Sequence, residues 1–262
     1  MAQGEPIVRF RHVRKAFGPK VIFHDLTLDL LRGETITIMG GSGTGKSVCL
    51  KMLIGLLTAD GGEIYLGDQD VTKMNDEQLT EVRRRVAYLF QGAALFDSLS
   101  VGENVAYGLR EQFWDKMTEE EIQGRVAQSL TLVGLPGIEG MRPSDLSGGM
   151  KKRVGLARTL ALQPEVILYD EPTTGLDPIN TARINHLIMG IQRALKLTSV
   201  VVTHDMGTAF TVSDRLAMIG RGRILLVGTK DDFKNTRNPA VRDFIEGRAP
   251  ETEDVAALLS SS

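Results

Sequence analysis

The sequence predicts an α/β fold: a parallel sheet with an N-terminal antiparallel β subdomain and an inserted α-helical subdomain. Two short apolar runs, Val166–Tyr169 and Ser199–Thr203, end in polar residues and are typical of strands buried on both faces. The segment 178–195 repeats apolar residues at the spacing of one helix face, and Asp177 supplies its cap. Strands that alternate with helices indicate an α/β sheet. Residues 92–160 are instead mostly helical in pattern.

Composition limits the class of protein. The chain has 262 residues, 42% hydrophobic and 24% charged, with a formal net charge of −2. This balance gives no electrostatic footprint for nucleic acid. The single cysteine, Cys49, excludes an internal disulfide, and no apolar run approaches the roughly 18 residues of a membrane span. We therefore expect a cytosolic protein without a signal peptide, whose membrane role depends on a partner.

The N-terminal part predicts three strands and a helix. The β-like stretches Ile7–Val13 and Val21–Leu30 come first. A third strand, Thr35–Met39, leads into a glycine cluster and then a helix over Lys46–Leu57. We expect Cys49 to be a small core residue on the buried face of this helix.

The middle of the chain predicts three helices and the two loops beside them: Val101–Arg110, Glu119–Val133, Ser147–Leu162, Gly92–Ser100 and Gly134–Asp145. We assign them to a helical subdomain over about 92–160, inserted in a domain of residues 1–247. The tail, 248–262, is acidic and then serine-rich. It is either a disordered segment or a short helix, Val255–Leu259, that binds a neighbouring subunit.

A phosphate-binding loop is the strongest motif. "GGSGTGKS", Gly40–Ser47, fits G-x-x-x-x-G-K-[ST] and lies between a strand and a helix. Glycines let backbone N–H groups surround phosphate oxygens, Lys46 can reach the β- and γ-phosphates, and Ser47 can bind Mg²⁺. The alternative is an ordinary glycine turn with a solvated lysine. The predicted nucleotide-binding residues here are Gly40, Gly41, Ser42, Gly43, Thr44, Gly45, Lys46, Ser47 and Val48.

Two carboxylates follow a later strand. In "VILYDEP", Val166–Pro172, Asp170 and Glu171 lie where a buried strand ends. Ligands of open α/β sheets bind at this edge, and two adjacent buried carboxylates are costly without a cation. We expect Asp170 to hold Mg²⁺ through water and Glu171 to orient the attacking water.

Two further residues follow strands. His204 comes after "SVVVT", and we expect it to contact the γ-phosphate rather than to be a structural histidine. Gln91, in "VAYLFQG", follows another buried strand. Its amide either contacts Mg²⁺ and the attacking water or caps a loop.

"DLSGGMKKRV", residues 145–154, has an unusual order for a helix start. Ser147 is a good N-cap, but Lys151, Lys152 and Arg153 follow in the first turn, where the helix dipole disfavours cations. Such a local conflict is expected at a functional site, which here would receive an anion.

Together these motifs resemble the nucleotide-binding subunits of ATP-binding cassette (ABC) transporters. The matches run in order: Phe17, Gly40–Ser47, Gln91, "LSGGM" at 146–150, "VILYDEP", "GLDP" at 175–178 and His204. The resemblance implies a RecA-like P-loop NTPase core, ATP and Mg²⁺ as cofactors, and catalytic roles for Glu171, His204, Lys46 and Gln91. It implies that Mg²⁺ is held by Ser47, Gln91 and Asp170.

The same resemblance implies a second copy of the chain. In this family two cassettes enclose ATP, so Phe17 would stack on adenine and Ser147, Gly148 and Gly149 would contact the γ-phosphate bound by the partner. The cations after Gly149 would then face that phosphate, and Asp177 would lie at the interface. Met150 departs from the family's usual glutamine, and we expect activity to be kept.

The cargo follows only from a finer resemblance. "LFQGAALFDSLSVGENVAYGLRE" is similar to the ATPases of Mla-type phospholipid systems. It implies a permease docked near Gln91–Val101, an MCE-type lipid-binding protein, and a place at the cytoplasmic face of the inner membrane. The segment "GAALFDSLSV", 92–101, offers Leu95, Phe96 and Leu99 close together, and it either docks that permease or packs in the core of the helical insert. Two alternatives stay open: an importer ATPase for amino acids or another small solute, and a soluble ABC ATPase acting on DNA or ribosomes.

Overall fold

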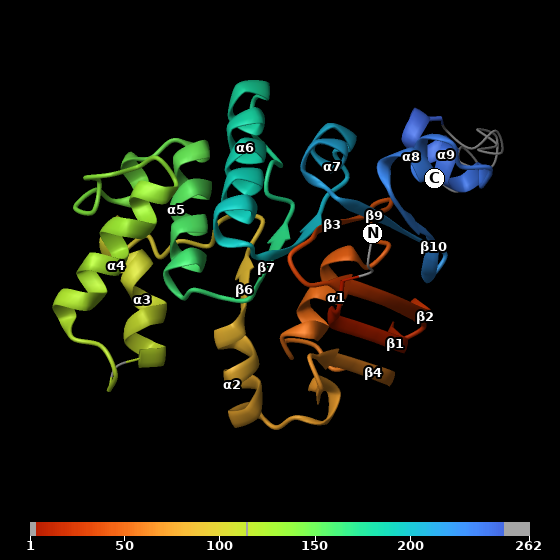
Figure 1. Cartoon of the computed structure of the whole chain (residues 1–262), viewed down its shortest axis with the longest axis horizontal. Helices are drawn as coiled ribbons and strands as arrows, with labels where there is room; N and C mark the ends of the chain where they lie inside the picture. Colours follow the sequence, from red (N-terminus) through yellow and green to blue (C-terminus); the bar gives the residue numbers. More distant parts are fainter. Residues whose placement is uncertain (1–3, 114, 249–262) are drawn as a thin grey trace, which may run out of the picture.

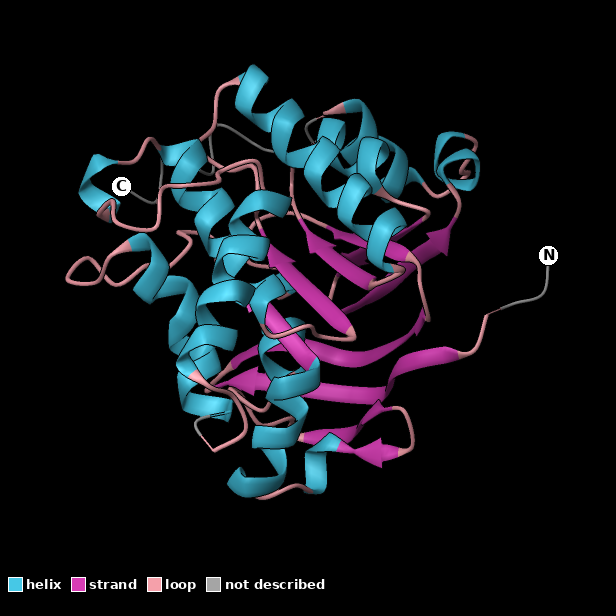
Figure 2. Cartoon of the chain, turned by 60° about the vertical axis from the view of Figure 1, so that its left-hand side comes forward, coloured by secondary structure: helices cyan, strands magenta, loops and turns pink. Residues whose placement is uncertain are grey.

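The computed structural model describes residues 4–113 and 115–248. Within these residues, ten strands form one sheet in the order β5-β4-β1-β2-β10-β9-β3-β8-β7-β6, with the helices around it (Figures 1 and 2). The strands are β1 Pro6–Phe17, β2 Lys20–Leu31, β3 Thr35–Met39, β4 Gly61–Leu66, β5 Gln69–Asp70, β6 Val86–Leu89, β7 Val166–Asp170, β8 Thr198–Val202, β9 Arg215–Gly220 and β10 Arg223–Gly228.

The half of the sheet from β9 to β6 is parallel and buried. Strands β3, β7 and β8 expose almost nothing on either face, as their continuous apolar runs predict. The register pairs Ile36 with Val200 and Asp170 with Val202, so the carboxyl ends of these strands meet at one edge. The predicted α/β class is confirmed.

The other half is antiparallel. Strands β1, β2, β4 and β5 pair antiparallel, and β10 joins this half to β9. Strand β10 pairs with β2 at one position, where Arg223 lies opposite Asp25. The predicted strands at 7–13 and 21–30 are therefore the inner parts of the longer β1 and β2.

The helices are α1 Lys46–Leu53, α2 Asp76–Arg85, α3 Val101–Phe113, α4 Glu119–Leu132, α5 Gly148–Ala161, α6 Pro178–Leu195, α7 Met206–Val212, α8 Lys230–Lys234 and α9 Pro239–Glu246, with 3₁₀ turns at Val71–Lys73 and Pro143–Asp145. The prediction that the first helix reaches Leu57 is wrong. Helix α1 ends at Leu53 because Ile54 caps it and Gly55 takes a left-handed φ of 66°.

Helices α3, α4 and α5 pack against one another on the left of Figure 1. A buried cluster around Val105, Val126 and Leu156 fills the space between them. The predicted helices of the insert and the helix at 178–195 are thus present.

Cys49 is buried, as expected, and donates from Sγ to the Lys46 carbonyl at 2.8 Å. Burial raises the pKa of this thiol to about 12. The segment Val255–Leu259 lies outside the described residues. Within the part of the chain that the structure describes, no helix combines the length and the apolar character that crossing a membrane requires.

Candidate active site

A cleft lies at the edge where β3, β7 and β8 end. Its cavity measures about 750 Å³. The residues that line it come from the phosphate loop, from three strand ends and from two outlying segments: Lys20, Ile22, Gly41, Ser42, Gly43, Gly45, Lys46, Ser47, Val48, Gln91, Glu171, His204 and Phe244. The structure therefore brings the phosphate loop, Gln91, Glu171 and His204 to one place.

The phosphate loop needs its glycines for shape. Gly45 has a φ of 97°, and a Cβ there would lie 2.4 Å from Cγ2 of Ile22. Gly40 has a φ of 152°, and its Cβ would lie 2.5 Å from the Ile219 carbonyl oxygen. The loop is thus fitted closely between β2 and β9, with no room for side chains at these two positions.

Lys46 folds back over this loop. Its Nζ donates to the carbonyls of Gly40 and Gly41 at 2.9 and 3.1 Å. Burial lowers the pKa of this ammonium, while the charges of Glu171 and Asp170 oppose the shift. The lysine is therefore placed between the loop and the two carboxylates.

Asp170 is buried and has two hydroxyl partners. Ser47 Oγ and the Tyr88 hydroxyl each donate to it at 2.6 Å. A serine hydroxyl and a carboxylate oxygen side by side are ligands that Mg²⁺ prefers. Sequence reasoning missed Tyr88, because a tyrosine in an apolar strand carries no signal of its hydrogen-bond partner.

Glu171 has an unusual backbone and four polar contacts. Its φ is 51°, which is rare outside glycine. His204 Nδ1 lies 2.9 Å from both carboxylate oxygens, and the hydroxyls of Thr174 and Thr203 donate to Oε2 at 3.0 and 3.3 Å. Backbone strain of this kind is concentrated at functional sites. The structure thus pairs His204 with Glu171, and the two threonines were missed.

Gln91 is exposed at the end of β6 and reaches the cleft. The loop after it has left-handed residues at Ala93 and Ala94, with φ of 61° and 47°. Arg158 of α5 donates to both of their carbonyls, at 2.6 and 2.8 Å. Two hydrogen bonds from Arg158 therefore hold the loop beside Gln91 against α5.

Phe17 ends β1 and is 46% exposed. The Lys15 ammonium lies 5.1 Å from the centroid of its ring. Phe17 does not itself line the cleft, although Lys20 and Ile22 just beyond it do. An open aromatic face beside the cleft is compatible with stacking on a base.

The "LSGGM" segment lies apart from this cleft. Ser147 caps α5 by accepting the Met150 N–H at 3.3 Å, and Gly148 is exposed. Asp177 caps α6 through the N–H groups of Ile179 and Asn180 at 2.9 and 3.0 Å. The two caps adjoin, because a Cβ on Gly149 would lie 3.0 Å from Asn180 Oδ1. None of Ser147, Gly148, Gly149 and Asp177 lines the cleft of their own chain.

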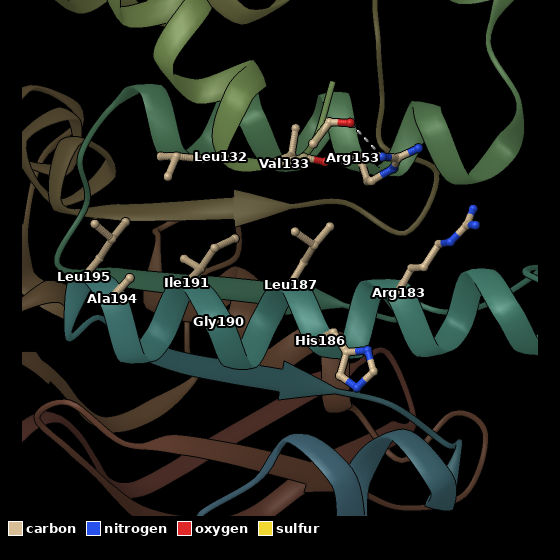
Figure 3. A pocket seen from close by; sticks show the side chains of 11 residues that line it. Leu132, Val133, Arg153, Arg183, His186, Leu187, Gly190, Ile191, Ala194 and Leu195 are labelled. Atoms are coloured by element: carbon tan, nitrogen blue, oxygen red, sulfur yellow. Dashed lines mark hydrogen bonds between the residues drawn. The ribbon is translucent and has the colours of Figure 1, made fainter. Parts of the chain in front are cut away.

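The expectation that all three cations after Gly149 face an external anion is wrong. Lys152 is buried, and its Nζ donates to the Glu171 carbonyl at 3.2 Å. Arg153 donates to the carbonyls of Val133 and Gly134, at 3.3 and 3.2 Å, in the segment after α4 (Figure 3). Lys152 and Arg153 are also the fifth and sixth residues of α5, so they lie beyond the first turn, where the helix dipole has less effect. Their carbonyl partners come from other segments, which the sequence does not reveal.

Figure 3 also shows the cavity beside Arg153 of α5, between α6 and the end of α4. It measures about 480 Å³. Leucines and isoleucine form one part of its wall, and Arg183 and His186 lie toward one end.

A third cavity, of about 500 Å³, lies between α2, β6, α3 and α5. Exposed Phe96 packs against exposed Tyr107, with the ring centroids 4.7 Å apart and the ring planes tilted by 46°. Phe90 and Leu56 add further exposed apolar surface. Leu95, in contrast, packs against the buried cluster of the helical region. Leu95 therefore packs as the core interpretation of this loop expects, whereas Phe96 is exposed, as the docking interpretation requires.

Comparison with known proteins gives a family match. The model of the ABC transporter family matches residues 23–174. A probable ribonucleotide transport ATP-binding protein of Mycobacterium leprae is 42% identical over 92% of this chain and 69% of its own length. The chain spans 65% of the corresponding protein of Mycobacterium bovis.

Two further relatives have names that refer to lipids. The chloroplastic protein TRIGALACTOSYLDIACYLGLYCEROL 3 of Arabidopsis thaliana is 42% identical over 92% of this chain and 74% of its own. MlaF of Haemophilus influenzae, an ATP-binding protein of an intermembrane phospholipid transport system, is 38% identical over 88% and 87%.

Among solved structures, a dimeric ATP-binding cassette in a post-hydrolysis state, bound to ADP and Pi, superimposes with a TM-score of 0.77. It is 31% identical and covers 85% of this chain and 98% of its own.

Proposed function

The chain belongs to the ABC transporter family as one of its ATP-hydrolysing cassettes, and from this premise we propose that it drives phospholipid transport between membranes. The observation that carries the catalytic part is the contact of His204 Nδ1 with both oxygens of Glu171, 2.9 Å away. This pair lines the same cleft as Lys46 and Gln91.

We propose that hydrolysis proceeds by in-line attack of water on the γ-phosphate. Lys46 would move from its loop carbonyls to the phosphate oxygens. Glu171 would orient and polarise the water, and His204 would hold the Glu171 carboxylate and contact the γ-phosphate. Gln91 would help to position the water. Catalysis of this kind is mostly positioning and charge stabilisation.

The donor set also fits a magnesium ion. Ser47, Asp170 and Gln91 would hold it, and the 2.6 Å contact between Ser47 and Asp170 supports this assignment. Mg²⁺ would neutralise charge on the phosphate oxygens when bound. Tyr88 would keep the Asp170 carboxylate in place.

We propose that two copies enclose two ATP molecules. Ser147, Gly148 and Gly149 have no role in the cleft of their own chain, and the N-terminus of α5 is suited to an anion. The γ-phosphate bound by the partner copy is that anion. Asp177, beside Asn180 and Gly149, would lie at the interface. The dimeric state of the similar cassette supports this arrangement.

The exposed aromatic cavity around Phe96 is the proposed docking site for a permease. It lies next to the loop after Gln91, so a docked helix would touch the segment that reaches the cleft. In this proposal the chain is peripheral at the cytoplasmic face of the inner membrane. An MCE-type lipid-binding protein would be an indirect partner.

The lipid cargo is supported by the two relatives with lipid names, while the ribonucleotide name of the mycobacterial relative favours a small-solute importer as the second candidate. The cassette does not itself contact the cargo in either case. The accompanying proteins therefore decide between the candidates.

The test is to isolate the complex from native membranes through this chain, measure ATP hydrolysis and identify bound proteins and lipids by mass spectrometry. We expect a permease, an MCE-type protein and phospholipid. Glu171→Gln should lower hydrolysis at least about 100-fold while keeping ATP bound, because it removes the charge that polarises water.

Phe96→Ala is the matched variant for docking. It should release the permease and leave ATP binding by the chain unchanged, because Phe96 lies outside the cleft. A solute-binding protein in place of the MCE-type protein would favour the importer. Ribosomes or DNA-repair proteins would overturn the transport role, and full hydrolysis by Glu171→Gln would overturn the site.

A further inference from the structure

The buried lysine in the first turns of α5 has no role in the proposed chemistry. Lys152 is 9% exposed, and its only hydrogen bond among the described residues goes to the Glu171 carbonyl at 3.2 Å. Burying an ammonium is costly unless it meets a partner of opposite charge. Burial lowers the pKa of the Lys152 ammonium, and the charge of the Glu171 carboxylate opposes this shift.

The carbonyl that Lys152 contacts belongs to a strained residue. Glu171 has a φ of 51°, and its N–H donates to the Val202 carbonyl at 2.9 Å. The Glu171 carbonyl accepts from Lys152 and, at 3.3 Å, from the Thr174 N–H. Such a backbone persists only where the surroundings over-determine it. Among the described residues, Lys152 is the one hydrogen-bond partner of the Glu171 main chain that comes from a helix.

The lysine also connects two parts of the site. It lies on α5, five residues after Ser147, which caps the same helix and does not line the cleft of its own chain. We propose that Lys152 is a positioning residue: it fixes the backbone of Glu171 and so links the helix that receives the partner's ATP to the catalytic carboxylate of its own chain. This inference rests on the proposed role of Glu171.

The test compares Lys152→Met, Lys152→Gln and Arg153→Met in the full chain. Methionine keeps the length of the side chain but removes the charge and the donor. It should lower kcat about tenfold, equivalent to one strong hydrogen bond, with KM and the Kd for ATP unchanged. Glutamine can still donate to the carbonyl and should restore most of kcat.

Arg153→Met is the matched control, because it removes a cation of the same helix turn that holds backbone carbonyls elsewhere. It should lower the midpoint of thermal unfolding without changing kcat. Unchanged kcat in Lys152→Met would overturn the proposal. Equal losses of kcat in all three variants would also overturn it, since they would indicate a purely structural helix effect.

The control for the underlying assumption is Glu171→Gln. If that variant hydrolyses ATP normally, the proposed role of Glu171 fails. If it is inactive and Lys152→Met is not impaired, only the inference about Lys152 fails.

Discussion

Gly45 illustrates how a single residue fixes the phosphate loop. Alanine there would combine a φ of 97° with a Cβ 2.4 Å from Ile22 and 2.7 Å from Phe23. We expect Gly45→Ala to lower the free energy of unfolding by about 3 kcal/mol, as overpacking does, and to abolish ATP binding. Urea unfolding and a fluorescent ATP analogue measure the two effects.

Gly43→Ala is its control. Gly43 also has a positive φ, 73°, but only the Lys20 ammonium lies near its Cβ, at 3.9 Å. The backbone conformation alone should cost about 1 kcal/mol. Equal destabilisation by both variants would show that the contact with Ile22 does not decide the effect.

At the scale of elements, an ion pair joins the starts of β3 and β9. Arg215 contacts the two oxygens of buried Glu34 at 3.0 and 3.2 Å. Arg215→Met would leave a buried carboxylate without its cation, so we expect a loss of about 3 kcal/mol in the free energy of unfolding at neutral pH. Urea titrations measure this loss. The double variant Glu34→Gln/Arg215→Met has no buried charge at this position and should regain most of the lost free energy of unfolding.

The pH dependence of that variant has a definite sign. Burial raises the pKa of Glu34 above its usual 4.5 even with Arg215 present. A raised pKa favours the protonated carboxyl in the folded state, so stability is lost as pH rises through the folded pKa. The deficit of Arg215→Met should therefore shrink as pH falls toward 4.5. A deficit that grows at acid pH would contradict the account.

The elements that sequence could predict are those with a strong local signal. Thr35–Met39 is predicted to the residue because it is apolar throughout and followed by glycines. Strand β10 was missed although Ile224–Val227 form a continuous apolar run, because a short apolar run alone does not distinguish a strand from a segment of a buried helix. The 3.6-residue period predicted α6, while the end of α1 depended on Gly55.

The residues of the site also fall into two groups, those that the sequence predicted and those that it did not. Lys46, Asp170 and Glu171 belong to sequence motifs and His204 follows a buried strand, so the sequence predicted that they meet at one sheet edge. Lys152 meets Glu171 only through the packing of α5 against the strand edge. Helix-dipole reasoning treats α5 in isolation and could not include this partner.

At the scale of the whole molecule, the proposed dimer predicts complementation. A chain with Lys46→Ala lacks the lysine of the phosphate loop, and a chain with Ser147→Arg lacks a working "LSGGM" segment. Each alone should be inactive. An equal mixture should regain about a quarter of the wild-type ATPase rate, because half of the dimers are mixed and each has one intact site.

ATPase measurements on the separate and mixed variants decide this. A mixture no more active than its components would contradict the proposed sandwich. Activity of Ser147→Arg alone would show that the segment is dispensable.

The two hydrogen bonds from Arg158 to the loop after Gln91 affect how the surface around Phe96 can evolve. Its two acceptors are main-chain carbonyls, which every residue type possesses. The side chain of Ala94 is exposed while its carbonyl is held. Side chains on the outward face of the loop can therefore change to suit a different docking helix, by mutation or by design, without loss of the Arg158 hydrogen bonds, provided that the residues at 93 and 94 accept a left-handed backbone.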